Sequence, residues 1–146
     1  MKSLMSKTVG FTVSSEPDSQ DYFDFNAYLV NNPTATITVQ AGGESMCKAG
    51  ISKGDLLVID RTIKPKSGQI VLVDLSSNLT IRRFVQAGNH IELHPDNFEP
   101  NSKIIKPKNY DVWSVIGVVT FVIKAMLWGK WAMYALIDGN CFFVSC

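Results

Sequence analysis

The chain has 146 residues, enough for one domain with a modest core. Its formal net charge of +1 argues against the strongly basic surface that general nucleic-acid binding needs. The three cysteines form no CxxC pair, which favours free thiols in a reducing cytoplasm, and we expect no metal site and no other cofactor.

Short strand patterns follow a polar start. Residues 1–22, rich in serine and charged residues, predict a flexible N-terminal arm. Residues 24–33 carry apolar residues at helical spacing and predict one short helix that ends at Pro33. Residues 35–41 alternate between apolar and polar, and further short β-rich runs follow, which together predict strands at 35–41, 55–60, 68–75, 79–86, 90–95 and 111–126. The last segment fits either one long strand bent at Gly117 or two strands.

Turn signals rich in Gly, Ser and Asn separate these strands, and no helical pattern lies between them. The fold prediction is therefore a mainly β, barrel-like domain of short strands over residues 23–126. His90 and His94 lie on one face of a predicted strand, where solvated histidines are the better interpretation. The most apolar region, residues 112–137, is interrupted by lysines before it reaches the roughly 20 residues that span a bilayer, so no membrane segment is expected.

Ser45 lies in the small-residue stretch "AGGESMCKAG" and is a candidate nucleophile. A serine hydroxyl is a weak nucleophile until a neighbouring base removes its proton. The turn from Gly42 and Gly43 to Met46 could offer backbone N–H groups to an oxyanion. On this motif alone, a turn serine that caps the next segment is the better interpretation.

Several further motifs follow Ser45 in order. They are Ser45-Met46, Gly54–Arg61, Gly68–Val71, Thr80–Arg83 and the strand pattern at 111–126. Together they resemble the LexA/UmuD family of self-cleaving serine peptidases, and its UmuD-like members most. The resemblance covers residues 10–126 and implies the β fold of the LexA/UmuD C-terminal domain, a cytoplasmic location and a homodimer.

The family uses a Ser-Lys dyad, in which a neutral lysine is the general base. The lysine position is occupied here by Arg82. A guanidinium has no acceptor lone pair, and a pKa above ~12 leaves roughly one part in 10⁵ neutral at pH 7. The resemblance therefore implies an impaired serine endopeptidase. Lys48 and Lys53 are near Ser45 in sequence, but nothing in the sequence places either beside it.

UmuD-like proteins cut their own arm just before a glycine, which predicts Val9–Gly10 as the bond here. Valine is branched at Cβ and should fit a small pocket less well than alanine does. Both departures from the family pattern, at Val9 and Arg82, predict slow or absent self-cleavage.

The last 20 residues, 127–146, differ in character. Residues 133–146 resemble the start of a UmuC-type Y-family DNA polymerase, with Asp138 at the position of a magnesium ligand, followed by Asn140, Phe142 and Phe143. One aspartate cannot hold two catalytic metal ions, so no polymerase activity is expected. We interpret the tail as a fusion or frameshift product; the alternative is a coincidental apolar tail.

Three functions remain open from the sequence. The first is an accessory protein of SOS mutagenesis that forms a homodimer, binds an error-prone translesion polymerase and responds to the RecA filament on single-stranded DNA. The second is an active self-cleaving peptidase with another base near Ser45. The third is a degenerate fusion fragment without activity. No helix-turn-helix pattern precedes Ser45, so sequence-specific DNA binding is not expected.

Overall fold

The computed structural model describes residues 23–108, 111–126 and 143–144, and this part of the chain is mainly β, as predicted. The elements are α1 (Phe25–Leu29), β1 (Thr36–Ala41), the 3₁₀ helix η1 (Cys47–Ala49), β2 (Leu56–Asp60), β3 (Ile70–Leu75), β4 (Asn78–Ala87), β5 (His90–His94), β6 (Trp113–Ile123) and β7 (Phe143–Val144). The six longer strands match the predicted segments to within about two residues at most ends, the usual uncertainty of element boundaries. The helix is present but ends at Leu29, four residues before Pro33.

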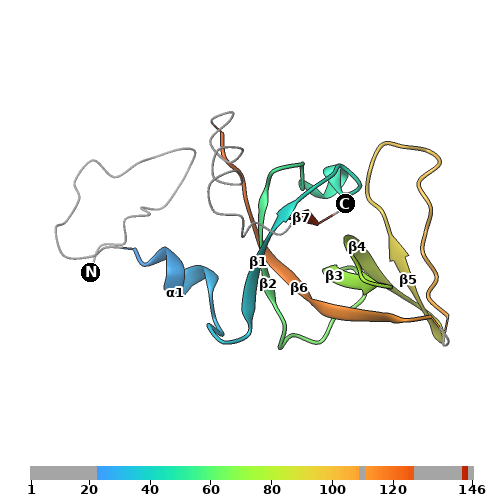
Figure 1. The fold of residues 1–146 in the computed structure, drawn as a ribbon, viewed down its shortest axis with the longest axis horizontal. Coiled ribbons are helices and arrows are strands. Elements are labelled where there is room, and N and C mark those ends of the chain that lie inside the picture. Colours follow the sequence, from blue (N-terminus) through green and yellow to red (C-terminus); the bar gives the residue numbers. More distant parts are fainter. Residues whose placement is uncertain (1–22, 109–110, 127–142, 145–146) are drawn as a thin grey trace, which may run out of the picture.

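All described strands form one sheet, in the order β5-β4-β3-β6-β2-β1-β7. The pairs among β1 to β6 are antiparallel, whereas β7 lies parallel to β1 at the end of the sheet (Figure 1). β7 also contacts β4, which belongs to the other half of the sheet. The sheet therefore curls toward a barrel, and the curl brings the ends of β1 and β4 into one region.

β6 is a single long strand that bends as it crosses the sheet (Figure 1). Its first half pairs with β3 and its second half with β2. Register shifts interrupt the pairing on either side of Gly117, between Leu72 and Val73 on β3 and between Val58 and Ile59 on β2. Such bulges bend a strand and increase its twist. Of the two predicted alternatives, one long bent strand is therefore correct.

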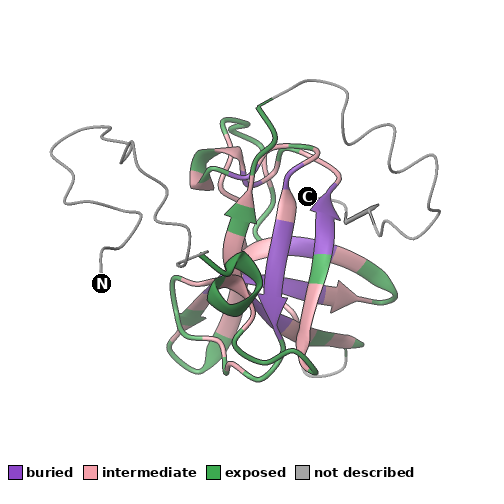
Figure 2. Ribbon diagram, turned by 90° about the vertical axis from the view of Figure 1, so that its left-hand side faces the viewer, coloured by how far each residue is buried: buried purple, intermediate pink, exposed green. Residues whose placement is uncertain are grey.

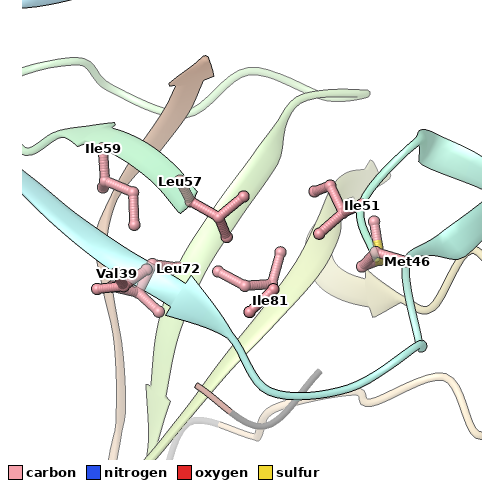
Figure 3. Close-up of a cluster of buried hydrophobic side chains, with 8 residues drawn as sticks. Val39, Met46, Ile51, Leu57, Ile59, Leu72 and Ile81 are labelled. Atoms are coloured by element: carbon pink, nitrogen blue, oxygen red, sulfur yellow. The ribbon is translucent and has the colours of Figure 1, made fainter. Parts of the chain in front are cut away.

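The larger of two buried hydrophobic clusters lies where β1, β2, β3 and β4 face the turn around η1. Its buried members are Val39, Ala41, Met46, Ile51, Leu57, Ile59, Leu72 and Ile81. Figure 3 shows Met46 and Ile51, which flank η1, at one end of this cluster. Both are completely buried, and burying a side chain of this size contributes about 1.5–3 kcal/mol. The turn that follows Ser45 is therefore anchored by packing.

The turn after β2 is fixed by a buried carboxylate. Asp60 is 4% exposed, and its Oδ1 accepts hydrogen bonds from Thr62 N at 2.8 Å and Thr62 Oγ1 at 2.6 Å. Its Oδ2 accepts one from Asn32 Nδ2 at 3.2 Å. These bonds, those from Thr62 first, hold the pKa of Asp60 below its ordinary value. The aspartate thus links the segment after α1 to the end of β2.

Helix α1 lies on the outside of the sheet and is largely exposed (Figure 2). Asp24 caps it by accepting a hydrogen bond from Ala27 N at 3.1 Å. The Tyr28 ring lies 5.4 Å from that of Phe121 on β6, which holds the helix against the sheet.

Within the described residues, no helix has the length and apolar content that crossing a membrane requires.

Candidate active site around Ser45

Ser45 lies in the turn between the end of β1 and η1. Backbone hydrogen bonds fix the end of β1, because Ala41 N donates to Asp55 O at 2.8 Å and Gly54 N donates to Ala41 O at 2.7 Å. On the other side, the buried Met46 holds the turn in the core. Ser45 itself is half-buried. A nucleophile on a short turn between two fixed points is well positioned for chemistry.

A second contact comes from the segment that follows β5. Asp96 N donates to Ser45 O at 2.8 Å, and Lys48 N donates to Asp96 O at 2.9 Å. The Asp96 carboxylate also forms an ion pair with Arg83 on β4, with Nη2 and Oδ2 2.6 Å apart. Asp96 therefore ties the Ser45 turn to β4. Sequence reasoning missed this residue, since it lies in a loop without periodicity or a motif.

Arg82 on β4 reaches Ser45 directly. Its Nη1 donates to Ser45 Oγ at 2.8 Å and to Ile81 O at 2.7 Å. Arg82 is half-buried, and it pairs with Val71 on β3 through the backbone. A guanidinium in this position favours a negatively charged oxygen, but it cannot accept the hydroxyl proton. The structure thus brings together the two residues to which the resemblance assigns the dyad; their roles in catalysis remain predictions.

Two backbone N–H groups beside Ser45 Oγ are available to a ligand. Within residues 23–108, 111–126 and 143–144, the N–H groups of Ser45 and Met46 donate no hydrogen bond to another described group. Adjacent N–H groups of this kind next to a nucleophile are the usual components of an oxyanion hole. Gly42 and Gly43 do not have positive φ angles, unlike Gly50 and Gly54. The turn therefore does not depend on a left-handed conformation at the predicted Gly43.

The lysines near Ser45 have other contacts. Lys48 Nζ lies 4.9 Å from the ring centre of Phe98, which is 77% exposed. Lys124, at the end of β6, binds the buried Asp55 carboxylate. Lys53 donates its backbone N–H to Glu44 Oε1 at 3.0 Å. In the part of the chain that the structure describes, no lysine side chain hydrogen-bonds to Ser45 Oγ.

Two sequence-predicted sites fall outside the described residues. The bond Val9–Gly10 is one of them, and the polymerase-like residues Asp138, Asn140 and Phe142 are the other. Phe143 belongs to β7, where it pairs with Gln40 through the backbone. Among the described residues, no group of three His, Cys, Asp or Glu side chains is arranged to hold a metal ion.

The two histidines of β5 flank a glutamate. His90 Nε2 lies 3.1 Å from Glu92 Oε1, and His94 Nε2 lies 2.8 Å from Glu92 Oε2. Lys106 Nζ lies 2.9 Å from the same carboxylate. Glu92 is only 13% exposed, and these contacts, that with Lys106 first, lower its pKa to about 2. The cluster joins β5 to the loop that follows it.

We expect Glu92→Gln to lower the free energy of unfolding at neutral pH. We also expect that free energy to fall less steeply in the variant as the pH is lowered. A carboxyl group with a depressed pKa contributes stability above its unfolded value of 4.5 and loses it as the pH falls through about 2. The difference in urea midpoint between the two proteins should therefore shrink below pH 4.5 and vanish near pH 2. Glu99→Gln, at an exposed glutamate, is the control and should change neither the urea midpoint at neutral pH nor its dependence on pH. If the difference in urea midpoint between the two proteins is still the same at pH 2, the ionised Glu92 carboxylate is not the source of the lost stability.

Comparison with known proteins gives one consistent family. Residues 3–120, which include Ser45 and Arg82, match the Peptidase S24-like family. The chain is 35% identical over 114 residues to Protein ImpA of Salmonella typhimurium and of Escherichia coli, which covers 78% of this chain and 76% of each relative. Identity to Protein SamA of S. typhimurium strain LT2 is 33% over 107 residues, covering 73% and 74%. The LexA repressor of Glaesserella parasuis is 31% identical over 97 residues, 66% of this chain but 46% of the repressor.

Proposed function

Because the chain belongs to the Peptidase S24-like family, as a UmuD-like member of its LexA/UmuD group, we propose that it is an accessory protein of SOS mutagenesis whose peptidase centre is silenced by an arginine. One observation carries the proposal. Arg82 Nη1 lies 2.8 Å from Ser45 Oγ, where a general base would have to lie. Compared with the Ser-Lys dyad of the family, the serine and the fold around it are present, whereas an arginine stands in place of the lysine that would act as the base.

The chemistry explains why this one contact is decisive. Cleavage requires Ser45 Oγ to lose its proton to a base and to attack the carbonyl carbon of Val9. The N–H groups of Ser45 and Met46 would stabilise the oxyanion, and the base would return the proton to the leaving amine of Gly10. Water would then hydrolyse the ester and release residues 1–9. A permanently protonated Arg82 blocks the first of these steps.

The proposed partners follow from the family. A UmuD-like protein acts as a cytoplasmic homodimer that binds an error-prone translesion polymerase, and it meets the RecA filament on single-stranded DNA. None of these partners needs a deprotonated serine. The substitution at Arg82 would therefore remove self-processing and leave the binding role intact. We regard the polymerase-like tail, residues 127–146, as the remnant of a fusion or frameshift with the partner's reading frame.

The test is to purify the unmodified chain and to follow its mass and its partners together. We expect intact-mass spectrometry to show no loss of residues 1–9 after incubation at pH 7, with or without RecA filaments. Light scattering should give twice the 16.2 kDa of the chain, and an immobilised Y-family polymerase should retain it.

The other two functions give different results in the same experiment. Loss of residues 1–9 that Ser45→Ala abolishes would show an active peptidase with another base. A chain that neither dimerises nor binds the polymerase would be a degenerate fragment. Either outcome would overturn the proposal.

A further inference from the structure

The outer edge of β1 leads directly to Ser45. The N–H and C=O groups of Ala41 bond toward Asp55 and Gly54, on the inner side of the strand. Successive residues of a strand point these groups in opposite directions, so those of Gln40 face the outer edge. An edge strand with exposed backbone groups is a template on which another extended segment can pair. β1 therefore offers a pairing site that ends beside the candidate nucleophile.

The chain's own C-terminal residues use this edge. β7 pairs with it in parallel, with Phe143 opposite Gln40 and Val144 opposite Ala41 (Figure 1). β7 also contacts β4, the strand that carries Arg82. A two-residue strand adds few hydrogen bonds, so it stabilises the sheet little and can be displaced.

Gln40, the residue of β1 that pairs with Phe143, has a buried side-chain oxygen without a hydrogen-bond partner among the described residues. Gln40 is 6% exposed, and its Nε2 donates to Gly54 O at 3.2 Å. Its Oε1 is buried and has no hydrogen-bond partner among the described residues. A buried acceptor without a donor is unfavourable by about 1–3 kcal/mol. This acceptor belongs to a side chain, whereas the pairing edge consists of backbone groups, so it marks an incompletely bonded polar site at the residue that pairs with β7.

The direction of β7 matters for chemistry. A segment parallel to β1 runs toward Ser45 as β1 does, so a peptide whose cleavage bond follows the residues opposite Gln40 and Ala41 would extend toward the nucleophile. In the predicted cleavage segment those residues are Thr8 and Val9, followed by Gly10. Phe143 and Val144, followed by a serine, have the same character: two residues with high β propensity before a small one.

We propose that the outer edge of β1 is a strand-addition site for an extended peptide, and that Phe143–Val144 occupy it in competition with the Thr8–Val9 end of the cleavage segment. The inference rests on the cleavage bond of the proposed function. Main-chain hydrogen bonds supply most of the affinity in this mode of recognition, so two unrelated segments of one chain can share the site. The C-terminal segment is then a second restraint on self-processing, independent of Arg82.

The first test uses the full chain with Arg82→Lys, in which the base is restored. Val144→Pro removes a backbone N–H from β7 and prevents pairing, whereas Val144→Ile keeps the strand. We expect Val144→Pro to speed the loss of residues 1–9 about tenfold, the gain if β7 occupies the edge roughly nine-tenths of the time. Val144→Ile should leave the rate unchanged. Equal rates of detectable cleavage in all three proteins overturn the proposal.

A second test works without any cleavage and separates this proposal from the proposed function. In the Ser45→Ala chain, amide hydrogen exchange of Val9, whose N–H takes the place of that of Val144, reports whether the arm pairs with β1, and Thr8, whose N–H points away, is the internal reference. We expect Val144→Pro to slow the exchange of Val9, because a freed edge lets the arm pair for a larger fraction of the time, and Val144→Ile to leave it unchanged. Slower exchange without cleavage in the Arg82→Lys chain would support the shared edge and reject the assigned base. Unchanged exchange rejects the shared edge whatever the cleavage shows.

Discussion

Arg82→Lys is expected to switch on cleavage of the bond Val9–Gly10, seen by intact-mass spectrometry as the loss of residues 1–9. The arginine already lies at hydrogen-bond distance from Ser45 Oγ, 2.8 Å, on a strand fixed by its pairing with β3 and β5. A lysine there has a shorter reach but a single nitrogen that can be neutral. Partial burial disfavours the ammonium form and lowers the lysine pKa. A positioned general base contributes about 10²–10⁴-fold to a rate, so the change should be from no detectable product to a clear one.

The pH dependence distinguishes a lysine base from other causes. The neutral amine is the active form, so the rate for Arg82→Lys should rise from pH 7 to pH 10 and level off above the lysine pKa. RecA filaments should increase the rate at pH 7 if the family's mode of activation applies. A rate that is flat across this range would mean that the introduced lysine does not act as the base.

Matched variants complete the experiment. Arg83→Lys makes the same chemical change one residue further along β4, where the side chain contacts Asp96 instead of Ser45, and it should remain uncut. Adding Ser45→Ala to Arg82→Lys should abolish the product. If the unmodified chain loses residues 1–9 as fast as the Arg82→Lys chain, another base serves Ser45 and the assignment of Arg82 is wrong.

The positions of the strands and of the short helix could be predicted from the sequence, because they depend on local residue patterns. Short β-rich runs mark the strands, whereas the helix ends at Leu29, four residues before the Pro33 that was expected to end it. The proximity of Ser45 and Arg82 is different in kind. Ser45 lies in a turn and Arg82 on a strand 37 residues further along the chain, so only the family resemblance could suggest that the fold brings them together, which it does.

The contacts that sequence reasoning missed are non-local and carry no pattern. Asp96 holds the Ser45 turn mainly through backbone atoms, and a backbone donor leaves no trace in residue type. β7 has only two residues, too few for a periodicity, and its pairing with β1 is parallel and distant in sequence. The bulges in β6 were signalled only by Gly117, whose position suggested a bend but not its cause.

Gly117→Ala, which adds a single methyl group within β6, should strongly destabilise the sheet. An added Cβ would lie 2.7 Å from the backbone O of Asp60 and 2.7 Å from Cγ2 of Ile59. Backbone atoms of β2 cannot move away without breaking the pairing of Asp60 with Val118. Overpacking of a close-packed site costs about 1–3 kcal/mol, and we expect the upper end of that range.

Thermal unfolding measures the effect, and a second glycine controls for it. For a domain of this size, about 3 kcal/mol lowers the Tm by roughly 10–15 °C. Gly88→Ala is the matched control, because Gly88 has a φ of 61° but nothing within 4 Å of an added Cβ. Its cost should be only that of the left-handed conformation, about 1–2 kcal/mol. The bend in β6 then requires Gly117 for space and the turn requires Gly88 for conformation. If both variants lose the same stability, the close approach of β6 to β2 is not what selects glycine at position 117.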